Sequence, residues 1–170
     1  MDPTELQKAK EAFDSQSLEG QVKDIEITKE LEDKFIRSLE NGTSFSMVFN
    51  IHKTFSVKVR DKTVKEAEII IRAVDKMCLR NKEVSWTEYS RMYNLFSLYY
   101  QIDEINGVVI NKEYPSSMYG DFDLAKLIEE TSPIPNWPLA TQYAALSSMC
   151  RFNNVAKKLA MKSIEDPSFF

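Results

Sequence analysis

Seven basic side chains crowd into the stretch between positions 58 and 80. They are Lys58, Arg60, Lys62, Lys65, Arg72, Lys76 and Arg80. Cations at this density can neutralise several phosphates, and each neutralised phosphate makes affinity fall as salt rises. The segment therefore predicts contact with the backbone of RNA or DNA. No aromatic residue interleaves these cations, so the sequence does not predict stacking on bases.

The same residues have a simpler explanation. A solvated amphipathic helix carries charges on its outer face whether or not it binds anything. Glu68 stands four residues before Arg72, in the order that favours an ion pair within a helix. The basic segment is therefore open to two interpretations, a binding surface and an ordinary solvated face.

Residue types that usually carry catalysis are scarce. The chain holds one histidine (His52), two cysteines (Cys78 and Cys150) and four glycines. Metal sites, nucleophile–base pairs and phosphate-binding loops draw on these residues. A lone histidine at a turn is typical of a surface residue, and both cysteines fall on apolar helical faces. We assign no catalytic residue, metal ligand or cofactor.

Acidic pairs are the remaining candidates for chemistry. Asp121 and Asp123 stand at the start of an expected helix, and Glu129 and Glu130 stand at its end. Helix capping and a solvated surface explain all four. They leave open an alternative, an enzyme or enzyme subunit that uses carboxylates near the loop at 114–123.

Aromatic residues recur along one expected helix at helical spacing. Trp86, Tyr89, Tyr93, Phe96 and Tyr100 follow one another at intervals of 3, 4, 3 and 4. A second apolar row flanks them, so this helix must be covered on more than one side. It is either the central helix of the domain or, through Trp86, Tyr89 and Tyr93, a contact in a homo-oligomer.

The C-terminal tail at 165–170 ends on two phenylalanines. Phe169 and Phe170 follow Pro167. Apolar rings at a terminus need a pocket, either on their own domain or on a partner protein such as a second copy. Docking on a neighbour would make the contact heterologous.

Length and composition predict one soluble domain. The chain has 170 residues, of which 43% are apolar and 28% charged. We expect one helical domain over 1–170, with a peripheral helix and loop at 1–20. Two cysteines indicate a reducing compartment, and no apolar run approaches the ~20 residues that span a bilayer. We therefore expect a cytoplasmic or nuclear protein with no membrane span.

The net charge of −4 hides an alternation along the chain. Residues 1–42 carry −5, residues 43–82 carry +5, residues 83–150 carry −6 and residues 151–170 carry +2. If the blocks stay apart on the surface, opposite faces carry opposite potentials, which favours docking of a polyanion. A fold that interleaves the blocks would cancel them.

Capping residues and apolar periodicity predict most of the helices. The expected helices span 2–14, 28–41 with Gly42 as stop, 63–81, 85–104 with Asn106-Gly107 as stop, 121–130 from an Asp121 cap, and 136–151 from an Asn136 cap. A further short helix is expected to start at Asn153 or Asn154 and to end before Asp166.

One stretch changes period. From Phe45 to Ile51 and from Phe55 to Arg60, apolar and polar residues nearly alternate, which predicts two antiparallel strands joined at His52-Lys53. A helix through Met47–Phe55 is the competing interpretation. The expected fold is mainly α, a single-domain multi-helix fold with a small two-stranded antiparallel element near residues 44–60.

Taken together, these features predict a non-enzymatic interaction or structural protein. It would associate with itself and contact the backbone of RNA or DNA through residues 58–80; a small viral structural or accessory protein would fit. The alternatives are the enzyme described above and a helical adaptor that binds a peptide.

Overall fold

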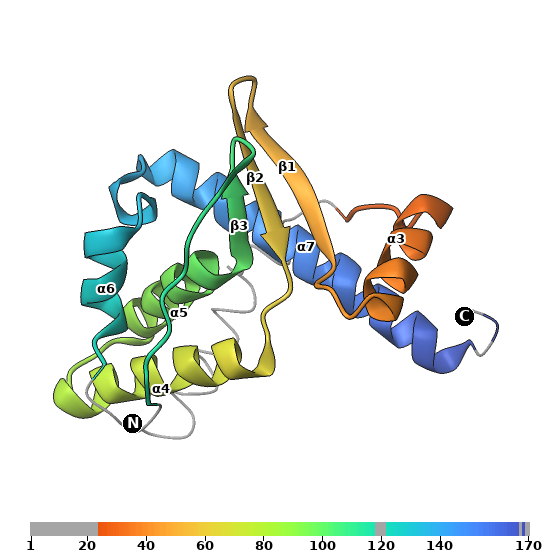
Figure 1. Cartoon of the computed structure of the whole chain (residues 1–170). Coiled ribbons are helices and arrows are strands. Elements are labelled where there is room, and N and C mark those ends of the chain that lie inside the picture. Colours follow the sequence, from red (N-terminus) through yellow and green to blue (C-terminus); the bar gives the residue numbers. More distant parts are fainter. Residues whose placement is uncertain (1–23, 118–121, 167, 169–170) are drawn as a thin grey trace.

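A computed structural model describes residues 24–117, 122–166 and 168 (Figure 1). These residues form five α-helices, four strands and one 3₁₀ turn. In chain order they are α3 (Lys29–Glu40), β1 (Ser46–His52), β2 (Phe55–Arg60), α4 (Val64–Arg80), α5 (Trp86–Gln101), β3 (Ile102–Ile105), β4 (Val108–Val109), α6 (Leu124–Thr131), η1 (Ile134–Asn136) and α7 (Leu139–Glu165).

The four strands form one antiparallel sheet in the order β1-β2-β3-β4. Alternate residues of β1 and β2 face the helices, among them Phe49, Val57 and Val59, and the long helix α7 packs against them. Figure 1 shows α7 running behind the sheet, while the β1–β2 hairpin projects above the helices. The other face carries Val48 and Lys58 and is more polar.

Helix α5 lies between two apolar clusters. Leu98 belongs to the cluster built around the sheet and α7, whereas Met92, Phe96 and Tyr100 belong to a cluster with α4 and α6. The double row of apolar residues predicts that this helix is covered on more than one side, and the structure shows it. Helices α4 and α6 therefore both pack against α5, and Figure 1 shows α4 and α5 below the sheet with α6 at their left.

The mainly helical expectation holds, but the expectation of a two-stranded element is wrong, because the sheet has four strands. The predicted helix over 85–104 ends at Gln101, and the chain continues as β3. Asn106 and Gly107 have φ values of 51° and 76°. These left-handed residues make the turn between β3 and β4, as Asn-Gly does in tight hairpins. The same dipeptide also ends helices, which explains the error.

The C-terminal helix is longer than expected. One helix, α7, replaces the helix predicted over 136–151 and the short helix predicted from Asn153 or Asn154. Phe152, Val155 and Leu159 are buried and continue its apolar face past the two asparagines. The expected Asn136 cap is also wrong: Asn136 lies in η1, and Pro138 holds the N-cap position.

Other helix boundaries follow their capping residues. Thr63 and Ser85 cap α4 and α5, and Gly42, with φ 62°, follows the end of α3. Asp123 caps α6, in place of the predicted Asp121. The predicted helix over 2–14, the loop after it and Asp121 lie outside the described residues. The β1–β2 hairpin excludes a helix through Met47–Phe55.

Within the described part of the chain, no helix combines the length and apolar character needed to cross a bilayer.

Candidate nucleic-acid interface

Helix α4 carries the cationic surface, and a capping box fixes where it begins. Thr63 Oγ1 accepts a hydrogen bond from the Glu66 N–H at 3.1 Å, and the Glu66 carboxylate accepts one from the Thr63 N–H at 2.9 Å. Both contacts satisfy N–H groups that a helix start leaves unpaired. This start sets the rotation of the helix, so Ile69, Ile70 and Val74 face the core.

Three of the predicted cations share one face of α4. Lys65, Arg72 and Lys76 are spaced by seven and four residues, which brings them within about 40° of one another around the helix. Lys65 and Arg72 are exposed and Lys76 is half-buried. We call these three residues the α4 stripe. Arg80, the last residue of the helix, is exposed and lies one further step of four residues past Lys76, about 60° around the helix axis from Lys65.

A narrow groove runs beside the stripe. Ile69, Arg72 and Lys76 of α4 line one side of the groove. Pro115 and Ser117, from the segment between β4 and α6, line the other side. Its volume of ≈ 20 Å³ accommodates about one water molecule. A nucleotide or metabolite cannot enter it, so the stripe offers charges at a surface and not a pocket.

Tyrosines from distant positions lie next to two of the cations. The Lys65 Nζ lies 5.7 Å from the centre of the Tyr114 ring, and the Lys62 Nζ lies 5.3 Å from that of Tyr93. Tyr100 packs against the Tyr114 ring at 5.5 Å between centroids. Because Tyr114 is flanked by Lys65 and Tyr100, it orients a cation and does not offer a free platform for bases.

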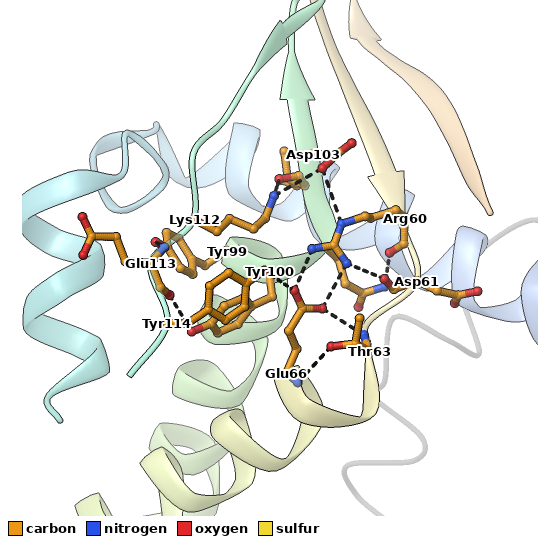
Figure 2. A network of polar contacts seen from close by, with 12 residues as sticks. Arg60, Asp61, Thr63, Glu66, Tyr99, Tyr100, Asp103, Lys112, Glu113 and Tyr114 are labelled. Carbon is orange, nitrogen blue, oxygen red and sulfur yellow. Dashed lines mark hydrogen bonds and ion pairs between the residues drawn. The ribbon is translucent and has the colours of Figure 1, made fainter. Parts of the chain in front are cut away.

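Arg60 belongs to an internal network and not to the stripe (Figure 2). Its two Nη atoms donate to the two carboxylate oxygens of Glu66 at 3.0 and 2.7 Å, and its Nε lies 3.4 Å from Asp103 Oδ1. The Glu66 side chain is 1% exposed and that of Arg60 is 12% exposed. Two carboxylates therefore match this guanidinium charge.

Further donors complete the network. Tyr114 Oη donates to Glu66 Oε1 at 2.7 Å, and Lys112 Nζ lies 3.7 Å from Asp103 Oδ1 and donates to the Ile102 carbonyl at 2.6 Å. Figure 2 shows these side chains converging from β2, α4, β3 and the segment after β4. The positive charges of Arg60 and Lys112 equal in number the negative charges of Glu66 and Asp103. The network therefore contributes little to the electrostatic potential at the surface.

Lys58 is matched on the outer face of the sheet. Its Nζ donates to Glu104 Oε1 at 2.7 Å across β2 and β3. The hydrogen bond to Glu104 raises the pKa of Lys58. Among the seven cations predicted from sequence, Lys58 is thus paired within the sheet, and Arg60 is paired with Glu66 of α4 and Asp103 of β3. The other five, Lys62, Lys65, Arg72, Lys76 and Arg80, lie on or beside α4.

Burial and hydrogen bonding shift the network's pKa values in opposing directions. Burial pushes the pKa of Glu66 upward, but hydrogen bonds from Arg60, the Thr63 N–H and Tyr114 outweigh it and hold that pKa below its usual value. The hydrogen bond to Glu66 raises the pKa of Arg60. Both groups are therefore charged near neutral pH.

The surrounding groups are shifted mainly by burial. Burial, with the nearby Arg60 charge, lowers the pKa of Lys112. Burial and the hydrogen bond to Glu66 raise the pKa of Tyr114 to about 12, and burial raises that of Tyr100 as well. Burial also raises the pKa of Asp61. Neither tyrosine is poised to act as a base near neutral pH.

The network satisfies itself, and this limits its chemistry. Glu66 accepts from Arg60, Thr63 and Tyr114, and Tyr100 Oη donates to the Glu113 carbonyl at 3.0 Å. The charged groups of this network are paired with one another, which is typical of a structural network that joins secondary-structure elements. It fixes α4 against the sheet and so sets the direction in which the stripe faces.

Other candidates for chemistry lie apart from this region. His52 is exposed in the β1–β2 turn, where its Nδ1 lies 3.3 Å from the Thr54 N–H, and Cys78 and Cys150 are both half-buried. Asp123 Oδ1 accepts from the Lys126 N–H at 3.1 Å and so caps α6. Across the described residues, no group of three His, Cys, Asp or Glu side chains is placed to hold a metal ion.

The predicted oligomer contacts are spread over different environments. Trp86 is 41% exposed and stacks on Tyr89 at 5.4 Å, while Tyr89 and Tyr93 are half-buried against the cluster of α4 and α6. Burial raises the pKa of Tyr89. Phe169 and Phe170 lie outside the described residues.

Sequence reasoning missed Lys112, Asp103 and Tyr114 as partners of the basic segment. The capping-box spacing singled out Glu66, but as a cap alone. Arg60 in a strand, six residues before a buried glutamate that also begins a helix, is a signal that could have indicated the pair. The other partners come from positions about 40 to 50 residues away, and no local pattern reveals them.

No protein-family model, curated protein or solved structure matches this chain in the three comparisons.

Proposed function

We propose that this protein is a non-enzymatic, self-associating binding protein that holds the phosphate backbone of RNA or DNA against the α4 stripe. The observation that carries the proposal is the alignment of Lys65, Arg72 and Lys76 along one helix face. From the first to the last of these the helix rises about 16 Å, enough to follow several phosphates of one strand. A cytosolic or nuclear location is part of the proposal.

The proposed binding surface is smaller than the basic segment at 58–80, because it leaves out Lys58 and Arg60. Lys58 and Arg60 are matched by carboxylates, so they support the sheet and α4 instead of facing a ligand. Glu68 and Asp75 are exposed on the neighbouring face of α4, which restricts the favourable potential to the stripe. Binding is thus expected to be electrostatic, weakly dependent on base sequence and strongly dependent on salt.

A salt titration tests this proposal. We expect a single-stranded RNA of mixed sequence to bind at about 50 mM salt, with log K falling by about 2 per decade of salt for three phosphate contacts. The variant Lys65→Gln/Arg72→Gln/Lys76→Gln removes most of this slope. The matched control, Lys29→Gln/Lys34→Gln/Arg37→Gln on α3, loses the same charge from exposed positions and keeps the slope.

The alternatives make a different prediction for the same titration. An enzyme using carboxylates of the 114–123 loop, or a helical adaptor for a peptide, has no reason to bind RNA with this salt dependence. Absence of binding at low salt, or equal loss in the stripe variant and the α3 control, eliminates the nucleic-acid role.

A further inference from the structure

The outer edge of β1 is uncharged, contains no proline and is unpaired by any strand of the described residues. The strand reads Ser-Met-Val-Phe-Asn-Ile-His from Ser46 to His52, and β2 pairs with its other side. The described elements that pack most against β1 are β2 and α7. Edge strands of soluble proteins usually carry lysine, proline or a bulge that blocks pairing with another chain. Along the stretch from Ser46 to Asn50, β1 has none of these.

The hydrogen-bond pattern shows which backbone groups face this edge. The Asp61 N–H donates to the Phe45 carbonyl at 3.2 Å, so odd-numbered residues of β1 bond to β2. The hydrogen bonds of Ser56 in β2 support the same assignment. Its N–H donates to Asn106 Oδ1 and its C=O accepts from the Asn106 N–H, so the even-numbered residue faces away from β1. The N–H and C=O groups of Ser46, Val48 and Asn50 therefore point outward.

We propose that a second copy of this chain occupies the edge, pairing β1 antiparallel with its own β1. Such a pairing joins two four-stranded sheets into one of eight strands. In a register centred on Phe49, the outward backbone groups of Val48 and Asn50 face each other across the two-fold axis. Because residues of equal parity then lie opposite, the apolar face of one strand continues that of the other.

The composition of the strand favours a copy of itself over a charged peptide. No residue of β1 from Ser46 to Ile51 is ionisable, so antiparallel self-pairing sets no like charges against each other. Met47 and Ile51 are half-buried on the core-facing side and gain cover from the same residues of the partner. The inference rests on the proposed self-association and assigns a surface to it.

Proline substitution at an outward N–H tests the pairing without breaking the described sheet. Val48→Pro removes a donor that β2 does not use, and edge strands tolerate proline at such positions. A matched control exists at the opposite edge. Val109 of β4 is 64% exposed against 62% for Val48, and its N–H faces away from β3, because the adjacent Ile110 N–H is the one bonded to Asp103.

Sedimentation velocity over about two decades of protein concentration reads out the association. We expect a dimer for the wild type and for Val109→Pro, and for Val48→Pro a dissociation constant raised at least about tenfold with an unchanged melting temperature. In the wild type, exchange of the Val48 and Asn50 amide hydrogens slows as concentration rises. A melting temperature lowered in Val48→Pro alone directs the test to this exchange measurement.

The outcomes separate two failures. A wild type that stays monomeric overturns self-association and the β1 edge together. Exchange protection of Val48 that is independent of concentration would also overturn the β1 edge, because it would show that this edge is covered within a single copy of the chain. A wild-type dimer that Val48→Pro leaves intact, with unprotected Val48 and Asn50 amides, overturns only the β1 edge. Neither result decides whether a single α4 stripe binds phosphate, which the salt titration tests separately.

Discussion

Glu66 and Arg60 form a bidentate ion pair in which each carboxylate oxygen accepts from one Nη atom, at 3.0 and 2.7 Å. The pair joins the last residue of β2 to the first turn of α4, and Glu66 also completes the cap of that helix. One nearly inaccessible carboxylate thus fixes both the start of α4 and its docking on the sheet.

Removing one partner of this pair is expected to destabilise the fold, because it leaves the other partner as a charge that is largely inaccessible to solvent. Glu66→Gln leaves the Arg60 charge without its main partner and lowers the free energy of unfolding by about 3 kcal/mol. Arg60→Met strands the carboxylate in the same way. We expect the double variant to lose less than the two single losses combined, as measured by urea unfolding of all four proteins.

An exposed pair provides the contrast. Lys126 and Glu130 lie 3.9 Å apart with side chains 70% and 61% exposed. Lys126→Gln is expected to change the free energy of unfolding by no more than about 0.5 kcal/mol. For the Arg60 and Glu66 variants, the contradicting result is a double variant whose loss in free energy of unfolding equals the sum of the two single losses. That result would show that the two side chains do not stabilise each other.

Acid is expected to weaken the protein partly through Glu66. Its pKa is lowered in the folded state, so the stabilisation is complete above the unfolded value of about 4.5 and is lost as pH falls through the folded pKa. Urea unfolding at a series of pH values from neutral downward measures this. Glu66→Gln has no proton to bind, so its stability falls less steeply below pH 4.5. Parallel curves for the two proteins would contradict the lowered pKa.

Tyr114 is expected to stabilise the fold at neutral pH and to stop doing so in alkali. Its pKa is raised from 10.0 to about 12, so the contribution is complete below pH 10 and disappears as pH rises through about 12. Tyr114→Phe removes the hydrogen bond to Glu66 and costs about 1 kcal/mol at pH 7, because the ring is 45% exposed. Free energies of unfolding at pH 7, 9 and 11 measure the difference between the wild type and Tyr114→Phe, which is expected to be smaller at pH 11 than at pH 7 and 9. Tyr143→Phe, at an exposed position of α7, is the control.

Local chemistry predicts those parts of the fold in which one short signal has one meaning. Thr63 with Glu66, and Ser85 with Glu88, place two helix starts correctly, and the alternation from Phe45 to Arg60 yields the hairpin. Asn106-Gly107 has two meanings, since positive φ both ends helices and makes tight turns. Only the pairing of β3 with β2 decides between them, and that pairing joins residues more than forty positions apart.

The candidate site, like the fold, is predictable from sequence only where a local pattern decides it. Helical spacing alone aligns Lys65, Arg72 and Lys76. The pairing of Arg60 with Glu66 and Asp103 commits one cation of the basic segment to the fold, and the pairing of Lys58 with Glu104 commits another. A count of basic residues therefore overstates the binding surface wherever strands bring distant acids beside them.

Gly107→Ala tests the turn between β3 and β4 directly. Gly107 has φ +76°, and a Cβ there would meet nothing within 4 Å, so the cost is backbone strain alone. We expect a loss of about 1 to 2 kcal/mol in the free energy of unfolding. The control Asn111→Ala changes an exposed residue just past the hairpin and leaves stability nearly unchanged. A neutral Gly107→Ala would mean that the turn does not hold the left-handed conformation.

Pairing through β1 would join two α4 stripes in one assembly, and nucleic acid of sufficient length could then contact both. The second contact becomes intramolecular, so affinity rises without new contacts within either copy. We expect Val48→Pro to weaken binding of an RNA of about 40 nucleotides by at least about tenfold while leaving an RNA of about 8 nucleotides unaffected, because the short strand follows only one stripe of about 16 Å. Val109→Pro is expected to bind both lengths as the wild type does. Equal weakening for the two lengths would instead place Val48 at the phosphate contact itself, and no change for either would mean that the two stripes cannot be reached by one strand.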